Sequence, residues 1–214
     1  MLVEEIMIQD VITLAPTDTI AEALHLLDTY KIRHIPIVNH ANHIVGIISD
    51  RDIRDASPSI LDPSSQSTEL SEPIYRIMKK NVITAHPLDF VEDMANVFYE
   101  NQIGCIPVTQ ENRLIGVVTE RDLLRSFIQL TGSHKPGSHI EVKVKNQAGV
   151  LSDVTAIFGQ HRTNILSVLV YPDKDDRYKV LVFRVQTFNP LSILNDLRDH
   201  GYEVIWPKPL ENTL

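Results

Sequence analysis

The stretch GIISDRDIR, residues 46–54, recurs further along the chain as GVVTERDLL, residues 116–124. Each copy begins with a glycine and an apolar run, and then changes to a hydroxyl residue, an acid, an arginine and an aspartate. A short apolar run followed by such residues is typical of a buried strand that ends where a helix begins. The sequence therefore predicts the same strand-to-helix junction twice, within a duplicated module.

The duplication extends to the N-terminal side of this junction. MIQDVITLAPTD, residues 7–18, corresponds to MKKNVITAHPLD, residues 78–89, and KIRHIPIV, residues 31–38, corresponds to QIGCIPVT, residues 102–109. The period of 70 to 71 residues is longer than the repeats of solenoid proteins. We therefore expect two copies of one small domain rather than a long array.

Each copy is predicted to fold as β-α-β-β-α. The first strands are expected at VITL, residues 11–14, and at VITA, residues 82–85, because both are short apolar runs soon followed by a proline. A unit this small has little core of its own, so the two copies are expected to share one. The inward face of the helix that follows is predicted to hold Ile20, Leu24 and Leu27 in copy one, and Val91, Met94, Ala95 and Phe98 in copy two.

The chain is predicted to contain three domains of mixed fold class, α+β or α/β. Residues 1–60 and 77–132 hold the two copies, and residues 61–76, which contain several serines and prolines, are predicted to be a linker. Residues 139–210 do not repeat the earlier pattern and are expected to fold as β-α-β-β-α-β. The first helix of this third domain is predicted to turn Val150, Leu151, Val154, Ile157 and Phe158 inward.

The composition argues against several classes of protein. The chain has 43% hydrophobic and 22% charged residues, a net charge of -8 and no apolar run of membrane-spanning length. An acidic chain lacks the positive surface that binding to a nucleic-acid polymer requires. The acidic N-terminus does not resemble a signal peptide, and Cys105 is the only cysteine, so we expect a cytoplasmic protein without disulfides. No metal site and no membrane partner is predicted.

The repeated junction has the chemistry of an anion site. The N–H groups in the first turn of a helix are unpaired, and the helix dipole is positive there. In copy one, Ser49 adds a hydroxyl donor, Arg51 a guanidinium suited to phosphate, and Asp52 a carboxylate that can accept hydrogen bonds from ribose. The same spacing also matches a helix capping box, so a purely structural role is the alternative. The corresponding residues of copy two are Thr119, Arg121 and Asp122.

The unit VITLAP…HIPIV…IVGIISDRD, present twice between residues 7 and 130, resembles a CBS domain pair, or Bateman module. The resemblance implies two clefts between the copies that bind adenosine compounds such as AMP, ATP, a dinucleotide or S-adenosylmethionine. It also implies that the first strand and the proline-containing strand hold the base, that the aspartate takes the ribose, and that the residues before it face the phosphates. Carried over to this sequence, the two sets are Thr13, Ile35, Ser49, Arg51 and Asp52, and Thr84, Ile106, Thr119, Arg121 and Asp122.

The two copies differ where phosphates are expected. Arg33 and His34 stand just before the Ile-Pro pair of copy one, whereas Gly104 and Cys105 take these positions in copy two. Basic residues contact phosphate there in related modules, so the resemblance adds Arg33 and His34 to the predicted nucleotide-binding residues. We therefore expect two unequal clefts. The alternative is that both residues only end a helix and interact with its dipole.

The last segment, residues 139–207, resembles an ACT domain, which has the ferredoxin-like β-α-β-β-α-β fold. The resemblance implies dimerisation, and allows an effector site for an amino acid at Asn146, Gly149 and Asn164. Asn146 and Ala148 stand where the family usually has aspartate and proline, which favours dimerisation over effector binding.

The whole order, a CBS pair followed by an ACT domain, resembles the AcuB family, which is linked to the use of acetoin and butanediol. We therefore expect a non-catalytic, regulatory homodimer that senses an adenine nucleotide and changes its contacts with an unidentified protein partner. The alternative is a dimeric structural adaptor whose clefts stay empty. An enzyme of acetoin breakdown is disfavoured and no cofactor is expected, because the sequence shows no nucleophile, base or cofactor motif.

Overall fold

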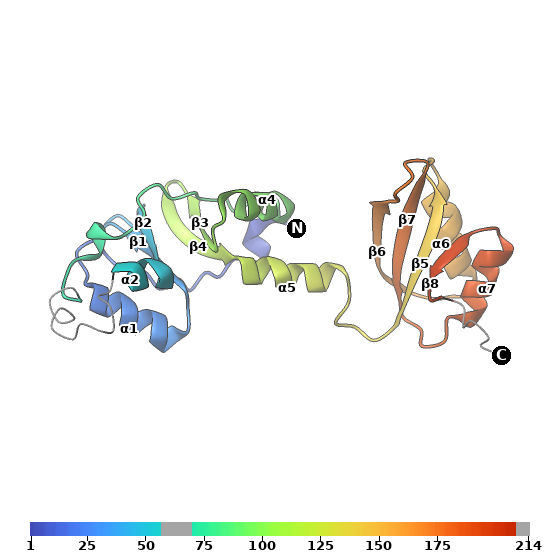
Figure 1. Ribbon diagram of the computed structural model, residues 1–214, viewed down its shortest axis with the longest axis horizontal. Coiled ribbons are helices and arrows are strands. Elements are labelled where there is room, and N and C mark those ends of the chain that lie inside the picture. The colour runs from blue at the N-terminus through green and yellow to red at the C-terminus, as the bar shows by residue number, and fades with distance from the viewer. Residues whose placement is uncertain (57–69, 209–214) are drawn as a thin grey trace. The chain divides into compact units, whose positions relative to one another are not determined.

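The computed structural model of the chain describes residues 1–56 and 70–208. The chain divides into two compact units, Met1–Leu124 and Arg125–Leu214 (Figure 1). The boundary falls within the helix that follows the second repeated junction. Most of the predicted linker, residues 61–69, lies outside the described residues.

Each copy in the first unit consists of a helix, an antiparallel hairpin and a second helix. The elements are α1 (Ile20–Tyr30), β1 (His34–Val38), β2 (Ile44–Ser49) and α2 (Asp50–Ala56) in copy one, and α4 (Val91–Asn101), β3 (Cys105–Gln110), β4 (Arg113–Thr119) and α5 (Glu120–Leu130) in copy two. The second helix begins at Asp50 or Glu120, directly after the hydroxyl residue that ends the strand. The predicted strand-to-helix junction is therefore confirmed in both copies.

The predicted first strands, residues 11–14 and 82–85, are not regular strands, because each segment makes only one parallel bridge. In copy one, the N–H of Leu14 donates to the carbonyl of Pro36 at 3.3 Å, and its carbonyl accepts from the N–H of Val38 at 2.9 Å. The next bond of such a ladder requires the N–H of Pro36, which proline lacks. Pairing therefore stops after one bridge, and the equivalent proline limits copy two in the same way.

The two copies exchange the short helices that precede them. The 3-10 helix η1 (Val3–Glu5) belongs to the start of the chain, but Val3 lies in the hydrophobic core of copy two. The matching helix η2 (Ile74–Arg76) precedes copy two, but Ile74 lies in the core of copy one. Both residues are fully buried. Each copy is therefore completed by a segment from the other side of the duplication.

The exchange continues into the segments that follow the short helices. Ile8 forms an antiparallel bridge with Val117 of β4, through two backbone hydrogen bonds of 2.9 and 3.0 Å. Lys79 forms the same bridge with Ile47 of β2, through two bonds of 2.9 Å. The backbone pairing therefore makes Ile8 and Lys79 structurally equivalent positions, in agreement with the repeat in the sequence.

The glycine that opens each repeated stretch leaves room for the exchanged segment. A Cβ atom at Gly46 would lie 2.5 Å from the sulfur of Met78, and a Cβ atom at Gly116 would lie 2.8 Å from the sulfur of Met7. Carbon and sulfur atoms cannot approach so closely without displacement, so a larger residue would force the methionine side chain to move. The repeated glycine therefore has a packing role.

The inward helix faces differ from the predicted ones at three residues. Leu24 in α1 is 46% exposed, while the neighbouring Ala23 is fully buried. Ala95 in α4 is exposed, and Leu151 in the first helix of the second unit is 39% exposed. The buried stripe of a helix is narrow, so a residue at its edge stays at the surface even when it is apolar. The other predicted inward residues are buried, namely Ile20, Leu27, Val91, Met94, Phe98, Val150, Val154, Ile157 and Phe158.

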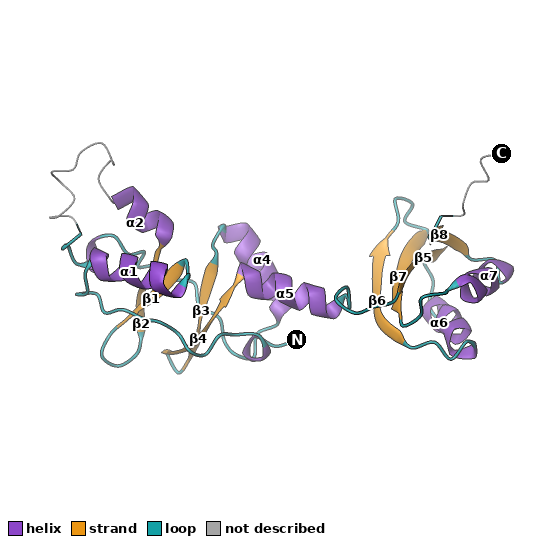
Figure 2. Ribbon diagram, turned by 90° about the horizontal axis from the view of Figure 1, so that it is seen from below, coloured by secondary structure: helices purple, strands orange, loops and turns teal. Residues whose placement is uncertain are grey.

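The second unit is a four-stranded antiparallel sheet with two helices on one face (Figure 2). Its elements are β5 (Ser138–Lys145), α6 (Val150–Gln160), β6 (Ile165–Pro172), β7 (Tyr178–Val185), α7 (Leu191–Asp199) and β8 (Glu203–Trp206). The strand order is β6-β7-β5-β8, which is the ferredoxin-like order, and the predicted β-α-β-β-α-β fold is confirmed. Phe158 and Phe183 lie at the centre of the core with their ring centroids 4.6 Å apart.

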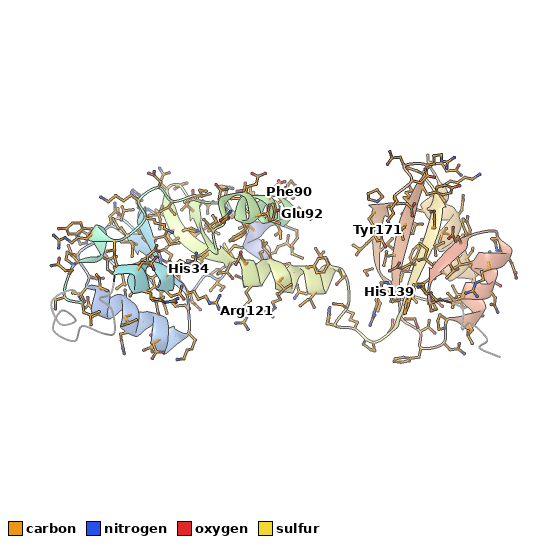
Figure 3. All side chains as sticks on the ribbon, viewed as in Figure 1. His34, Phe90, Glu92, Arg121, His139 and Tyr171 are labelled. Atoms are coloured by element: carbon orange, nitrogen blue, oxygen red, sulfur yellow. The ribbon has the colours of Figure 1, made fainter. Side chains whose placement is uncertain are left out.

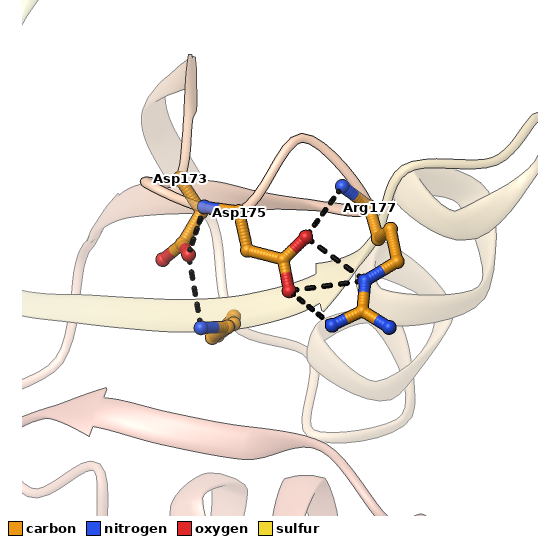
Figure 4. A network of polar contacts seen from close by, with 4 residues as sticks. Asp173, Asp175 and Arg177 are labelled. Atoms are coloured by element: carbon orange, nitrogen blue, oxygen red, sulfur yellow. Dashed lines mark hydrogen bonds and ion pairs between the residues drawn. The ribbon is translucent and has the colours of Figure 1, made fainter.

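The charged turn between β6 and β7 is held by ion pairs (Figure 4). Arg177 donates to Asp175 through Nη2 at 2.6 Å and through Nε at 2.9 Å. Lys143 of β5 donates to Asp173 at 3.0 Å. The hydrogen bonds from Arg177 lower the pKa of the Asp175 carboxyl. The turn therefore holds a defined set of contacts, although it lies at the surface.

Candidate functional site

A cavity of about 510 Å³ lies between the two copies of the first unit, and we call it the inter-copy cavity. It joins the region before the proline-containing strand of copy one to the strand-to-helix junction of copy two. Copy one contributes Ile8, Asp10, Val11, Ile12, Lys31, Ile32, Arg33, His34 and Pro36, and copy two contributes Gly104, Cys105, Val117, Thr119, Glu120, Arg121 and Asp122. The cavity arises from the exchanged segment, because the bridge between Ile8 and Val117 brings the start of the chain beside the junction of copy two.

Five of the predicted nucleotide-binding residues meet in this cavity: Arg33, His34, Thr119, Arg121 and Asp122. Figure 3 labels His34, at the start of β1, and Arg121, in the first turn of α5. The side chains of Ile35 and Ile106 are fully buried in the cores of their own copies, so only their backbone atoms are available to a ligand. Thr13 is half-buried and Thr84 is exposed, and neither lines the cavity.

Several lining residues were not predicted from the sequence. Val11 and Ile12 lie in the extended segment before Leu14, and both are half-buried. Asp10, Lys31 and Glu120 add charges to the rim of the cavity. The VIT triplet, which occurs twice in the sequence, could have indicated a role for Val11 and Ile12. The charged residues carry no such signal, because only the folded arrangement of the two copies brings them together.

The two junctions share the geometry of a helix cap. The backbone N–H and the hydroxyl of Thr119 donate to Oδ2 of Asp122 at 2.9 and 2.6 Å, and the N–H of Asp122 donates back to the hydroxyl at 3.4 Å. Ser49 and Asp52 repeat these contacts at 2.8, 2.5 and 3.2 Å. Both cap bonds from the hydroxyl residue fall on Oδ2 of the aspartate. In copy one, Nζ of Lys79 also lies 3.3 Å from Oδ1 of Asp52. Both junctions therefore form a reciprocal helix cap.

The charges around the inter-copy cavity suit a ligand that carries both hydroxyl and phosphate groups. Arg33 and Arg121 supply two guanidinium groups, which pair well with phosphate oxygens, although Asp10 and Glu120 add acids to the same lining. Lys31 also lines the cavity, but its Nζ donates to Asp28 at 2.7 Å. Asp122 supplies the carboxylate next to the N-terminus of α5, where the helix dipole also attracts an anion. The apolar side chains of Val11 and Ile12 provide a surface for a flat base.

His34 lies where the two copies meet, beside Gly104. A Cβ atom at Gly104 would lie 2.8 Å from Cε1 of His34, so the imidazole occupies the space beside this glycine. Burial lowers the pKa of His34, against the opposing effect of Asp50, Asp52 and Glu120. The lowered pKa favours the neutral form of the imidazole at neutral pH. A larger residue at position 104 would clash with the imidazole of His34. The comparison of the two copies in the sequence did not reveal this steric reason for the glycine.

The cavity shows no sign of a reactive thiol or a metal centre. Cys105 is buried, and burial raises the pKa of its thiol to about 12, so the reactive thiolate is not populated at neutral pH. Within residues 1–56 and 70–208, no group of three or more histidine, cysteine, aspartate or glutamate side chains is placed to hold a metal ion. In the same part of the chain, the helices are all too short or too polar to cross a membrane.

The residues of the predicted ACT effector site are engaged in other contacts. Asn146 donates through its side-chain amide to the carbonyl of Asp176 at 3.2 Å, and Asn164 donates to the side chain of Gln186 at 3.1 Å. Gly149 precedes α6 with a φ of 87°, a conformation that favours glycine. Of the three, only Asn146 lines the shallow cavity of about 370 Å³ beside the charged turn.

Comparison with family models identifies both parts of the chain. The model of the CBS domain matches residues 3–59 and 74–129, and the model of the ACT domain matches residues 138–201. The chain therefore belongs to the family of CBS-domain proteins. Its two copies form a tandem CBS pair, and an ACT domain follows them.

Individual relatives match part of the chain. An inosine-5'-monophosphate dehydrogenase of Methanocaldococcus jannaschii is 34% identical over 123 residues, which cover 57% of this chain and 23% of that enzyme. The chain also spans only 46% of a second curated relative from the same archaeon. The chain therefore spans less than half of the length of each of these two relatives.

Solved structures also resemble part of the chain. A crystal structure of a Vibrio cholerae protein named for acetoin utilization (AcuB) is 29% identical, with a TM-score of 0.54, and covers 64% of this chain and 98% of that one. The CBS domain pair of protein MJ0100, crystallised with 5'-methylthioadenosine and S-adenosyl-L-methionine, is 33% identical, with a TM-score of 0.52. It covers 63% of this chain and 98% of that one.

Proposed function

We propose that this chain is a non-catalytic regulatory protein that binds an adenine nucleotide in its inter-copy cavity. The observation that carries the proposal is the meeting of the Asp122 carboxylate, at a helix N-terminus, with the guanidinium groups of Arg33 and Arg121 in one cavity. The adenosine compounds in the MJ0100 structure support an adenosine ligand for a related CBS pair. Those ligands carry no phosphate, and the guanidinium groups of Arg33 and Arg121 favour a phosphorylated one such as AMP or ATP.

Thermal unfolding of the full chain with a ligand panel tests this proposal. A ligand at about 100 times its dissociation constant stabilises the folded state by about 2.7 kcal/mol. We expect AMP or ATP to raise the transition of the first unit more than 5'-methylthioadenosine does, because only the nucleotides can engage Arg33 and Arg121. GMP is the matched control, since it has the same sugar and phosphate and a different base. Equal transitions with and without every ligand would refute nucleotide binding.

A structural adaptor is the second candidate, and the cap geometry favours it. Both junctions form complete reciprocal bonds between the hydroxyl residue and the aspartate without a ligand. Such caps are sufficient to explain why the motif occurs at a helix start. In this case the protein acts through contacts with other proteins alone, and the ligand panel leaves the unfolding transition unchanged.

The proposed regulatory role includes a homodimer. The edge strand β6 exposes Leu169, Val170 and Tyr171, and α5 exposes Phe127 at 59% and Leu124 at 60%. An edge strand without charged residues can pair with a second sheet, and exposed apolar helix faces favour association. A symmetric dimer that buries both surfaces would explain why they are apolar.

Light scattering of the full chain at micromolar concentration tests the dimer. We expect twice the chain mass for the wild type, and a shift toward the monomer for Val170→Lys, because a lysine at the middle of β6 opposes strand pairing. Ser152→Lys, on the exposed side of α6, is the control that adds the same charge elsewhere. A monomeric wild type, or equal masses for the two variants, would contradict dimerisation through β6.

The regulated process and the partner complete the proposal. The likeness to the Vibrio cholerae protein supports a link to acetoin and butanediol utilisation. We place the protein in the cytoplasm, where nucleotide levels report on energy supply, and we assign the readout to an unidentified protein partner. The proposed domain limits are residues 1–60 and 77–132 for the CBS copies, residues 61–76 for the linker and residues 139–210 for the ACT domain.

A further inference from the structure

The inter-copy cavity contains a pair of residues of very different size, one from each copy. His34, labelled in Figure 3, is the first residue of β1 in copy one, and Gly104 directly precedes β3 in copy two. Both residues line the cavity. A Cβ atom at Gly104 would lie 2.8 Å from Cε1 and 3.2 Å from Nε2 of His34. The glycine of one copy therefore leaves the space that the imidazole of the other copy occupies.

The position of the imidazole depends on this glycine. A Cβ atom at position 104 would come too close only to the end of the His34 ring, because the next nearest atom, Oε2 of Glu120, is 3.8 Å away. The backbone of Gly104 does not have the positive φ that would require glycine. An alanine at this position would therefore displace the ring and leave the backbone in place. Gly104→Ala is thus a selective way to move His34 within a folded protein.

Charged groups from both copies face the imidazole. Burial has the largest effect and lowers the pKa of His34. The carboxylates of Asp50 and Asp52 in α2 and of Glu120 in α5 act in the opposite direction. The guanidinium group of Arg33 adds to the effect of burial. The other charged residues of the cavity lining are Asp10, Lys31, Arg121 and Asp122.

An anion in the cavity shifts this balance toward the charged imidazole. A phosphate beside Arg33 places negative charge next to His34, and a nearby negative charge favours the protonated form of histidine. Binding of the anion and uptake of a proton are then linked. Each of the two strengthens the other by the same factor, because a coupling free energy between two ligands is reciprocal.

We infer that Gly104 positions His34 in the inter-copy cavity, and that this cross-copy pair couples the binding of a phosphate-bearing nucleotide to the uptake of a proton. The inference rests on the proposed nucleotide binding and adds the proton as a second ligand of the same site. Gly104 acts through His34 and is a positioning residue. A module built in this way holds its nucleotide more tightly as the pH falls.

Isothermal titration of the full chain with AMP at two pH values tests the proton linkage. Between about pH 8 and pH 6, we expect the AMP affinity of the wild type to rise about fivefold relative to that of His34→Gln, which is a modest coupling between two ligands. Glutamine keeps a polar side chain but does not titrate in this range. The phosphate of AMP titrates equally in both experiments, so the comparison cancels its effect. Adenosine, which has no phosphate, should show no such gain.

Gly104→Ala tests the positioning of the imidazole. At about pH 6 it should lose the fivefold gain that the wild type has over His34→Gln, because the ring is displaced. In a His34→Gln background the same change should have no further effect. Gly159→Ala is the matched control, since a Cβ atom at this glycine of α6 would meet no other atom within 4 Å. Circular dichroism checks that all variants are folded.

The outcomes separate the inference from the proposed function. Wild type and His34→Gln that bind AMP with the same pH dependence overturn the proton linkage and leave nucleotide binding intact. An equal loss of affinity from Gly104→Ala in both backgrounds shows that the glycine acts without His34, and this overturns the positioning role. If AMP binds neither the wild type nor any variant at either pH, the proposed function itself fails, and the inference fails with it.

Discussion

Asp122→Asn should weaken AMP binding to the inter-copy cavity by about ten- to hundredfold. The ribose hydroxyls are expected to donate to the Asp122 carboxylate, and a hydrogen bond to a charged acceptor contributes about 1.5–3 kcal/mol. Asparagine has the same size and keeps one oxygen that can accept from the N–H of Thr119, so the helix start should remain intact. Isothermal titration gives the affinity, and circular dichroism checks the fold.

Asp52→Asn is the matched control for this experiment. The two aspartates make the same cap contacts, but Asp52 does not line the inter-copy cavity. The control should therefore leave AMP binding to the inter-copy cavity unchanged. Wild-type affinity in Asp122→Asn would remove the ribose role and leave the junction as a helix cap. An equal loss in both variants would show that the effect comes from the caps.

Phe158→Ala should lower the free energy of unfolding of the ACT domain by about 3–5 kcal/mol. Phe158 is fully buried and its ring centroid lies 4.6 Å from that of Phe183, so alanine would leave a cavity in the core. Differential scanning calorimetry should show a large downward shift of one transition. The hydrophobic cores of the CBS pair are separate from the core of the ACT domain. AMP should therefore still raise the unfolding temperature of the CBS pair.

Leu151→Ala provides the control in the same helix. Leu151 is 39% exposed, so its truncation should change the stability of the ACT domain by much less than the truncation of Phe158. Equal losses for the two variants would contradict the described core. Loss of AMP binding in Phe158→Ala would contradict the independence of the two units.

The sequence predicted the order of the elements well, because the local signals were strong. The repeated change from an apolar run to Asp50 or Glu120 located the helix starts, and alternating apolar residues located the strands of the ACT domain. Residues 11–14 and 82–85 do not form the predicted strands, and the reason lies elsewhere in the chain. Their pairing ends because the partner strand contains a proline. The strand propensity of residues 11–14 and 82–85 does not reveal this.

The candidate site was predicted less completely than the fold. The motif at Asp122 was visible in the sequence, but its meeting with Arg33 depends on the exchange of segments between the copies. An isolated residue such as Val3 does not indicate which of two similar cores it enters. The contact between Lys79 and Asp52 follows from the same exchange, and neither residue alone predicts it. The way in which the two related copies pack together therefore determines which residues meet in the site.

A crystal structure of the full chain grown with AMP at saturating concentration tests the central claim most directly. The account predicts a nucleotide in the inter-copy cavity, with its ribose hydroxyls within hydrogen-bond distance of Asp122 and its phosphate beside Arg33 or Arg121. The base should lie against Val11 and Ile12. An inter-copy cavity without AMP under these conditions, or AMP bound at a place that none of these residues lines, would contradict it.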